Sequence, residues 1–152
     1  MAAYARVAVA RSGAGWSVAA NAATLAAIAS FPAMAGGAGG TVTHFGVGSG
    51  SAGATELIFF GAVAPNIVVT AGVTPKLDTT TTVIQTAGGT DAMTASAANA
   101  FLLLLLNNTD WANVGDAAGL QDSATAGSLY LSLHTADPTE AGNQSSNEIS
   151  YT

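Results

Sequence analysis

Short strand-like segments, each closed by a Gly-rich turn, follow one another through the first 90 residues. Residues 4–9 alternate long and small side chains with a period of two, as half-buried strands do. Residues 41–47 are rich in β-branched side chains and lie between the Gly-rich turns 36–40 and 48–53. Strands at roughly ten-residue spacing with such turns are typical of sandwiches and barrels. We therefore predict a mainly β, single-domain antiparallel β-sandwich that is jelly-roll-like.

The other strand-like segments of this part differ in pattern. Residues 57–60 form a continuous apolar run, which favours a central strand buried on both faces. Residues 25–31 fit either a strand or a short helix, because alanine favours the helix. Further strands are expected at residues 67–70 and 79–84.

The chain changes character after a stretch of small and polar residues at 87–92, which is typical of a linker. Strong helix formers run from Ala97 to Leu106, and Thr94 or Ser96 can cap the start. We predict one short helix near 95–108. Because apolar side chains surround it, we expect it to be buried on most sides.

A loop is expected at residues 112–127, with Trp111 anchored against the sandwich. Residues 128–135 then give the clearest strand pattern in the chain, with three leucines on one face and Tyr, Ser and His on the other. Asp137 and Pro138 predict a turn after it, because Asp caps turns and Pro fixes the backbone.

Charge is scarce, and this excludes several function classes. Only 8% of the 152 residues are charged, against about 25% in an ordinary domain. Three Lys and Arg side chains against nine carboxylates cannot neutralise a row of phosphates, so we expect no nucleic-acid or anionic-membrane partner. With no cysteine, disulfides and thiol chemistry are excluded. The longest apolar run has seven residues where a membrane span needs about 20, and we expect neither a span nor a secretion signal.

Candidate sites for chemistry are few. His134 and Asp137 could act as a metal or acid–base pair, but a strand-end histidine beside a turn aspartate explains them as well. Oxygen ligands for calcium lie near the C-terminus, yet their spacing matches no EF-hand: Asp137, Glu140, Asn143, Asn147 and Glu148. Residues 48–53 match GxGxxG, but a strand follows where a nucleotide site needs a helix. We predict no catalytic residue, metal or cofactor.

Some polar and aromatic positions favour contacts rather than chemistry. His44 lies within an expected strand and is interpreted as packed or at an interface. Arg6 and Arg11 are interpreted either as ion-pair partners across a subunit contact or as ordinary surface arginines. The possible interface or structural residues are Tyr4, Arg6, Arg11, His44, His134, Asp137 and Pro138.

Several motifs together resemble a family of small virion proteins of tailed bacteriophages. They are LYLSLHTADP at 129–138, NEISYT at 147–152, YARVAV at 4–9, TVTHFG at 41–46 and LIFFGA at 57–62. Members of that family are often labelled tail fibre proteins, and some are capsid cement or decoration proteins.

The order of these motifs differs from that of the family. Residues 93–152 are similar to the family's N-terminal half and residues 4–87 to its C-terminal half. This order suggests a circular permutation with a seam at 87–92, so the two ends of the chain should lie close together. Natural rotation, deliberate rotation and an error of sequence assembly are all compatible with it.

The resemblance implies a structural role on the virion. A cement protein, made in the host cytoplasm, would bind the major capsid protein and neighbouring copies of itself on the capsid surface. The alternative is a tail-fibre or tail-tip protein that contacts the host surface. An enzyme is not expected, because no convincing pair of carboxylates for glycan hydrolysis is present.

Overall fold

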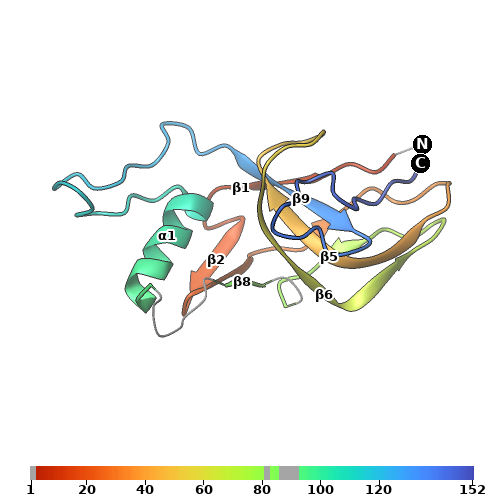
Figure 1. Cartoon of the computed structure of the whole chain (residues 1–152), viewed down its shortest axis with the longest axis horizontal. Helices are drawn as coiled ribbons and strands as arrows, with labels where there is room; N and C mark the ends of the chain where they lie inside the picture. The colour runs from red at the N-terminus through yellow and green to blue at the C-terminus, as the bar shows by residue number, and fades with distance from the viewer. Residues whose placement is uncertain (1–2, 81–82, 86–92) are drawn as a thin grey trace.

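A computed structural model of the chain describes residues 3–80, 83–85 and 93–152, and its described part is built from antiparallel strands with one helix. Figure 1 shows the elements. In chain order they are β1 (Val7–Ala10), β2 (Trp16–Ala19), β3 (Ala22–Leu25), β4 (Ala29–Ser30), β5 (Gly40–Gly48), β6 (Leu57–Val69), β7 (Lys76–Leu77), β8 (Val83–Gln85), α1 (Ala95–Asn107) and β9 (Ser128–His134).

The described strands form three antiparallel sheets. The largest has the order β1-β9-β5-β6, the second is β2-β3-β8, and β4 pairs with β7. The predicted mainly β, sandwich-like single domain is thus confirmed. The jelly-roll order of its strands stays a prediction.

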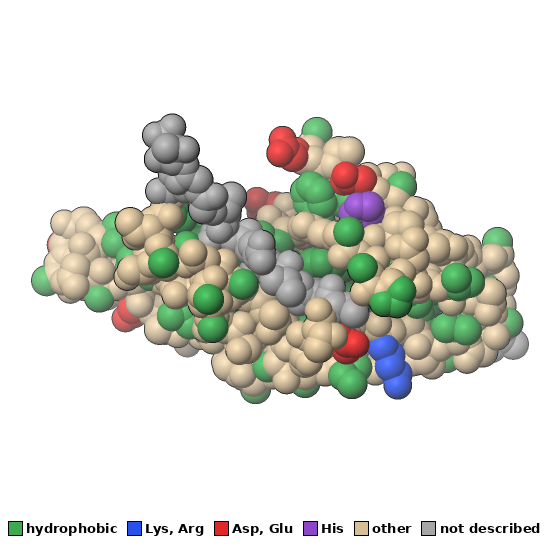
Figure 2. Space-filling model, turned by 90° about the horizontal axis from the view of Figure 1, so that it is seen from below, with side chains coloured by type: hydrophobic (Ala, Val, Ile, Leu, Met, Phe, Trp, Pro, Cys, Tyr) green, Lys and Arg blue, Asp and Glu red, His purple; other side chains and the backbone are tan. Residues whose placement is uncertain are grey.

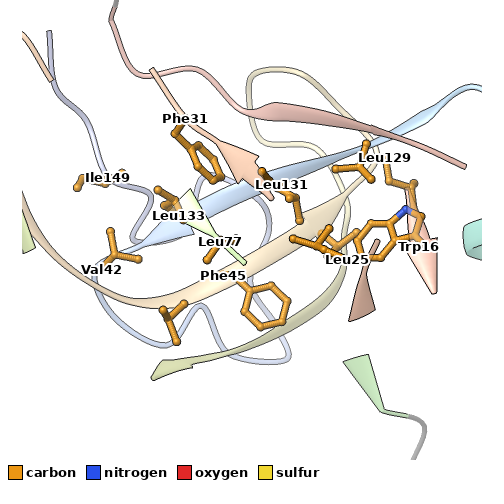
Figure 3. Close-up of a cluster of buried hydrophobic side chains, with 14 of the residues drawn as sticks. Trp16, Leu25, Phe31, Val42, Phe45, Leu77, Leu129, Leu131, Leu133 and Ile149 are labelled. Atoms are coloured by element: carbon orange, nitrogen blue, oxygen red, sulfur yellow. The ribbon is translucent and has the colours of Figure 1, made fainter. Parts of the chain in front are cut away.

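Strand β9 lies between β1 and β5 in the largest sheet and contributes three leucines to the hydrophobic core. The predicted alternation is confirmed, because Leu129, Leu131 and Leu133 are all buried on one face. Figure 3 shows these leucines packed with side chains from β2, β5 and β7, including Trp16 and Phe45. Burying a large apolar side chain contributes about 1.5–3 kcal/mol, so this cluster is the main source of stability.

Strand β6 differs from its prediction. The expected central strand at 57–60 lies at the edge of the large sheet, and Phe60 is 37% exposed. The segment expected as a separate strand from residue 67 belongs to the same strand, which bulges where its register against β5 shifts between Val42 and His44. Pro65 within β6 suits an edge position, since proline cannot donate to a neighbouring strand. An apolar run alone does not separate central strands from edge strands.

In one of the two remaining segments the structure decides between the alternatives, and in the other it shortens the expected strand. Residues 25–31 contain no helix: β3 ends at Leu25, and β4 follows at Ala29–Ser30. The strand expected at 79–84 appears in the described residues only from Val83, because Asp78 Oδ1 accepts hydrogen bonds from the backbone N and Oγ1 of Thr80 and fixes a turn there. Such side-chain bonds compete with strand formation.

Helix α1 has the predicted extent but not the predicted burial. Thr94 caps its start by accepting from the backbone N of Ala97, and Asn108 ends it in the left-handed conformation. Only Ala98, Leu102 and Leu106 are buried. The other positions from Ala97 to Asn107 are half-buried, and Phe101 and Leu105 pack against the core, so the helix is less fully buried than expected.

The ends of the chain lie side by side, as the permuted order requires (Figure 1). The backbone N of Tyr4 donates to Tyr151 O at 3.0 Å, and the backbone N of Thr152 donates to Gly36 O at 3.0 Å. The expected seam at 87–92 lies outside the described residues, so the permutation itself stays a prediction.

A rotated chain tests that prediction. A variant that starts at Met93 and runs from Thr152 directly into Tyr4 should fold, because the join replaces a contact that already exists. We expect its melting temperature to stay within about 4 °C of the parent, the shift that about 1 kcal/mol produces at this size. Circular dichroism and calorimetry measure this. A rotated chain that is unfolded under the same conditions would contradict it.

Candidate functional site

Polar side chains collect on the face of β9 opposite the leucines. This face is covered by residues 139–149 and by the loop at 49–56, which Gln144 joins to β9. Such a concentration of polar groups is the best candidate for chemistry in the described part of the chain. We call it the polar layer, and its members are Arg6, Thr55, Ser132, His134, Gln144 and Glu148.

The polar layer is centred on one ion pair. Arg6 Nε and Nη2 donate to the two carboxylate oxygens of Glu148 at 2.7 and 2.8 Å. The two side chains are 2% and 15% exposed. Bidentate pairing of this kind is strong and geometrically specific. The Glu148 carboxylate also raises the pKa of Arg6, chiefly through this hydrogen bonding.

The remaining N–H groups of Arg6 donate to the loop at 49–56. Nη1 donates to Gly50 O and to Thr55 Oγ1, both at 3.0 Å, and Nη2 donates to Gly53 O at 2.8 Å. A guanidinium has five N–H groups, and these bonds use all of them. Arg6 therefore has no donor left for an anionic ligand, and its role is to hold the loop and the C-terminal segment together.

Tyr4 closes the outer side of the ion pair. Its hydroxyl donates to Glu148 Oε1 at 2.9 Å and accepts from the backbone N of Leu133 at 2.9 Å. Burial, and next the Glu148 charge, raise the pKa of Tyr4 well above its ordinary value. The hydroxyl consequently stays protonated and acts as a fixed hydrogen-bond bridge.

Gln144 satisfies a second set of backbone groups. Its Oε1 accepts from Gly50 N at 3.0 Å and from Thr55 Oγ1 at 2.7 Å, while Nε2 donates to Tyr130 O at 3.0 Å. The side chain is fully buried. It fits there because position 48 is a glycine: a Cβ at Gly48 would lie 2.1 Å from Gln144 Cδ.

Ser132 and His134 form the pair that most resembles catalytic machinery. His134 Nδ1 lies 2.7 Å from Ser146 O, an acceptor, so Nδ1 carries the proton and Nε2 accepts from Ser132 Oγ at 2.9 Å. A base-activated serine nucleophile has this arrangement. Both residues are 0% exposed, and a Cβ at Gly46 would meet each at 2.6 Å. No substrate reaches the pair, so we interpret it as a packed hydrogen bond.

Burial of His134 predicts a pH dependence of stability. Desolvation, the largest cause, lowers its pKa from the ordinary 6.5. Below about pH 6.5 the unfolded chain therefore binds more protons than the folded chain. The stabilisation is complete above that pH and is lost as the pH falls toward the folded-state pKa, by up to about 1.4 kcal/mol per pH unit.

Two measurements check this. Proton NMR should show His134 in the folded chain titrating below 6.5, and urea unfolding should give a smaller free energy at pH 5.5 than at pH 7.5. The variant His134→Gln should lose part of that difference, because it removes the titrating group. A folded-state pKa at or above 6.5 would contradict the prediction.

The other predicted site residues lie apart from this chemistry. Asp137 Oδ1 accepts from the backbone N of Thr139 at 2.8 Å in the expected turn, beside the buried Pro138. His44 on β5 lies opposite His134 of β9, is half-buried, and contacts Thr43 Oγ1. Arg11 binds backbone carbonyls at the end of α1. Across the described residues, no group of three or more His, Asp or Glu side chains could hold a metal ion.

The sequence singled out Tyr4, Arg6 and His134. The structure joins Tyr4 and Arg6 through Glu148, whereas the side chain of His134 bonds Ser132 and Ser146 and meets Glu148 only through a backbone bridge.

Sequence reasoning missed Gln144 and the pairing of Arg6 with Glu148, which are distant in sequence. One feature of the sequence could have indicated this packing. Gly46 and Gly48 lie two positions apart within an expected strand, and glycine inside a strand marks the close approach of another group.

An open hollow of about 140 Å³ lies against the ion pair, lined by residues 4–6, 51–53 and Glu148. The groups that border it already bond one another, so it offers no free donor from Arg6.

Comparison with protein-family models, curated proteins and solved structures finds no match to this chain. Within the described residues, no helix is both long and apolar enough to cross a membrane.

Proposed function

We propose that this chain is a structural virion protein that binds the outside of a tailed-phage capsid as a cement or decoration protein. Its partners are the major capsid protein and neighbouring copies of itself. It works by binding alone, without catalysis or a cofactor. The support from the sequence is the set of motifs at 129–138, 147–152, 4–9, 41–46 and 57–62, which resemble small phage virion proteins.

The observation that carries the proposal is where polar and apolar groups lie. The side chains of the polar layer bond to one another and are largely buried, whereas several large apolar side chains stand exposed. Ile28 is 60% exposed and Leu120 45%. Removing exposed apolar side chains from water by contact with another protein is favourable.

The thinly charged surface supports broad contacts of this kind. Figure 2 shows one face on which blue and red side chains are sparse among apolar and uncharged ones. Few charges have to be desolvated when such a surface is covered. Many copies on one shell add their modest individual affinities through avidity.

Localisation on the particle tests the proposal. Virions produced from the genome that encodes this chain are purified, and the chain is located by cryo-electron microscopy with an antibody fragment raised against it. We expect many copies over the capsid faces. Labelling confined to the tail would overturn the cement function in favour of a tail-fibre or tail-tip protein. Virions that lack the chain would overturn both.

A further inference from the structure

A long ordered segment links α1 to β9 and extends away from the body of the molecule (Figure 1). We call residues 109–125 the arm. Fifteen of its seventeen residues are exposed, the exceptions being Trp111 and Gly119. Trp111 is half-buried, and its backbone N and O pair with Leu120 inside the arm at 2.9 and 3.0 Å, so its expected anchoring against the sandwich stays a prediction. Ordered loops of more than about 12–15 residues usually have a function.

Hydrogen bonds between the first and the last part of the arm hold it in one shape. Asn108, at its base, donates to Ser123 O at 2.8 Å and accepts from Ser123 N at 3.0 Å. Asp110 Oδ1 accepts from the backbone N of Asp122 at 2.7 Å. At the tip, Asp116 Oδ1 accepts from the backbone N of Ala118 and of Gly119. A binding element that is ordered in advance loses less conformational entropy when it docks.

Arg11 fixes the base of the arm to the fold. Its guanidinium donates to Leu104 O and Leu105 O at the end of α1 and to Ala126 O where the arm returns toward β9. A cation is favourable at a helix C-terminus, where the last carbonyls lack partners. Arg11 therefore sets the direction in which the arm leaves the body.

The arm presents apolar side chains among carboxylates. Val114 is 36% exposed and Leu120 45%. Asp110, Asp116 and Asp122 are all exposed beside them, and the sequence has no Lys or Arg after residue 76. The complementary surface is an apolar pocket with a rim of cations.

We propose that the arm docks into such a pocket on the major capsid protein, with Val114 and Leu120 in the pocket and the three aspartates against Lys or Arg at its rim. This inference rests on the proposed function and names the element that performs it. A second copy of this chain is a poor occupant. Arg6 and Arg11 are engaged with their own chain, so Lys76 is the one cation with an exposed side chain among the described residues.

Binding to shells that lack the chain tests the proposal. The shells come from the encoding genome with this coding sequence deleted, and bound protein is measured by co-sedimentation at several salt concentrations. We expect the double variant Val114→Ser with Leu120→Ser to bind about tenfold more weakly or worse, as loss of a contact hot spot does. The matched control Val68→Ser removes an equally apolar exposed side chain outside the arm and should bind less than about threefold more weakly.

A variant with altered charge provides the second part of the test. Asp110, Asp116 and Asp122 are replaced together with Asn, which keeps the oxygen acceptors and so the shape of the arm. Wild-type binding should weaken as salt rises, and this variant should lose most of that dependence.

The outcomes separate the two proposals. If the wild type does not bind the shells, the cement function is overturned and the arm inference with it. If the wild type binds but the arm variants match it or match Val68→Ser, only the arm inference is overturned. Self-association of the wild type that the arm variants abolish would assign the arm to a second copy instead.

Discussion

Replacing Arg6 with Met is expected to lower the free energy of unfolding by about 3–5 kcal/mol, the cost of removing one partner from a buried ion pair. Glu148, 15% exposed, would keep its charge without the guanidinium that now bonds both of its oxygens. Gly50 O in the 49–56 loop would also lose the Arg6 donor, and Gly53 O would keep only its bond from the backbone N of Thr55. Because domains are stable by only about 5–15 kcal/mol, this change removes a large part of the total.

Urea unfolding of three variants checks this expectation. Lys76→Met removes a cation from an exposed side chain and should change stability by less than about 0.5 kcal/mol. Arg6→Met combined with Glu148→Leu should cost less than the sum of the single changes, because the second removes the orphaned charge. If Arg6→Met costs no more than Lys76→Met, the ion pair does not hold the C-terminal segment in place.

The alternating pattern of β9 was predictable because it is local. Leucines at every second position between residues 129 and 133 determine which face enters the core, whatever the rest of the chain does. The cap of α1 was predictable for the same reason, since Thr94 bonds a backbone N only three residues away.

The elements whose environment was predicted incorrectly depend on partners that are distant in the sequence. The apolar run at 57–60 would suit either the centre or the edge of a sheet, and it lies at the edge because no described strand of this sheet pairs with β6 on the side away from β5. The apolar surface of α1 suggested burial all round, but β2 and β3 lie against one side of it, where Ala98, Leu102 and Leu106 are buried. Neither the edge position of residues 57–60 nor the degree of burial of α1 can be predicted from the sequence of that segment alone.

The candidate site was predictable only in part. Tyr4, Arg6 and His134 stand out because polar groups are rare in this chain, yet nothing local indicates that Glu148 is the partner, 142 positions from Arg6. The stronger clue is the pair of glycines in β5. Because alternate strand residues share a face, Gly46 and Gly48 open space on one face for the buried side chains of Ser132, His134 and Gln144.

Replacing Gly48 with Ala is therefore expected to be nearly as damaging as losing the ion pair. The new Cβ would lie 2.1 Å from Gln144 Cδ and 2.3 Å from the backbone oxygen of Glu56, and a backbone atom cannot turn aside. Expelling Gln144 would also break its bonds to Gly50, Thr55 and Tyr130. Overpacking of about 1–3 kcal/mol together with lost buried hydrogen bonds predicts about 3 kcal/mol or more.

Two matched variants separate this cost from the general effect of a methyl group. Gly13→Ala meets nothing within 4 Å and should be neutral or slightly stabilising, because alanine restricts the unfolded chain. Adding Gln144→Ala to Gly48→Ala relieves the side-chain clash but leaves the contact with Glu56 O, so stability should recover only in part. Chemical denaturation of these variants gives the comparison. Equal stability of Gly48→Ala and Gly13→Ala would mean that β5 has room at this position, and that Gln144 does not pack against it as described.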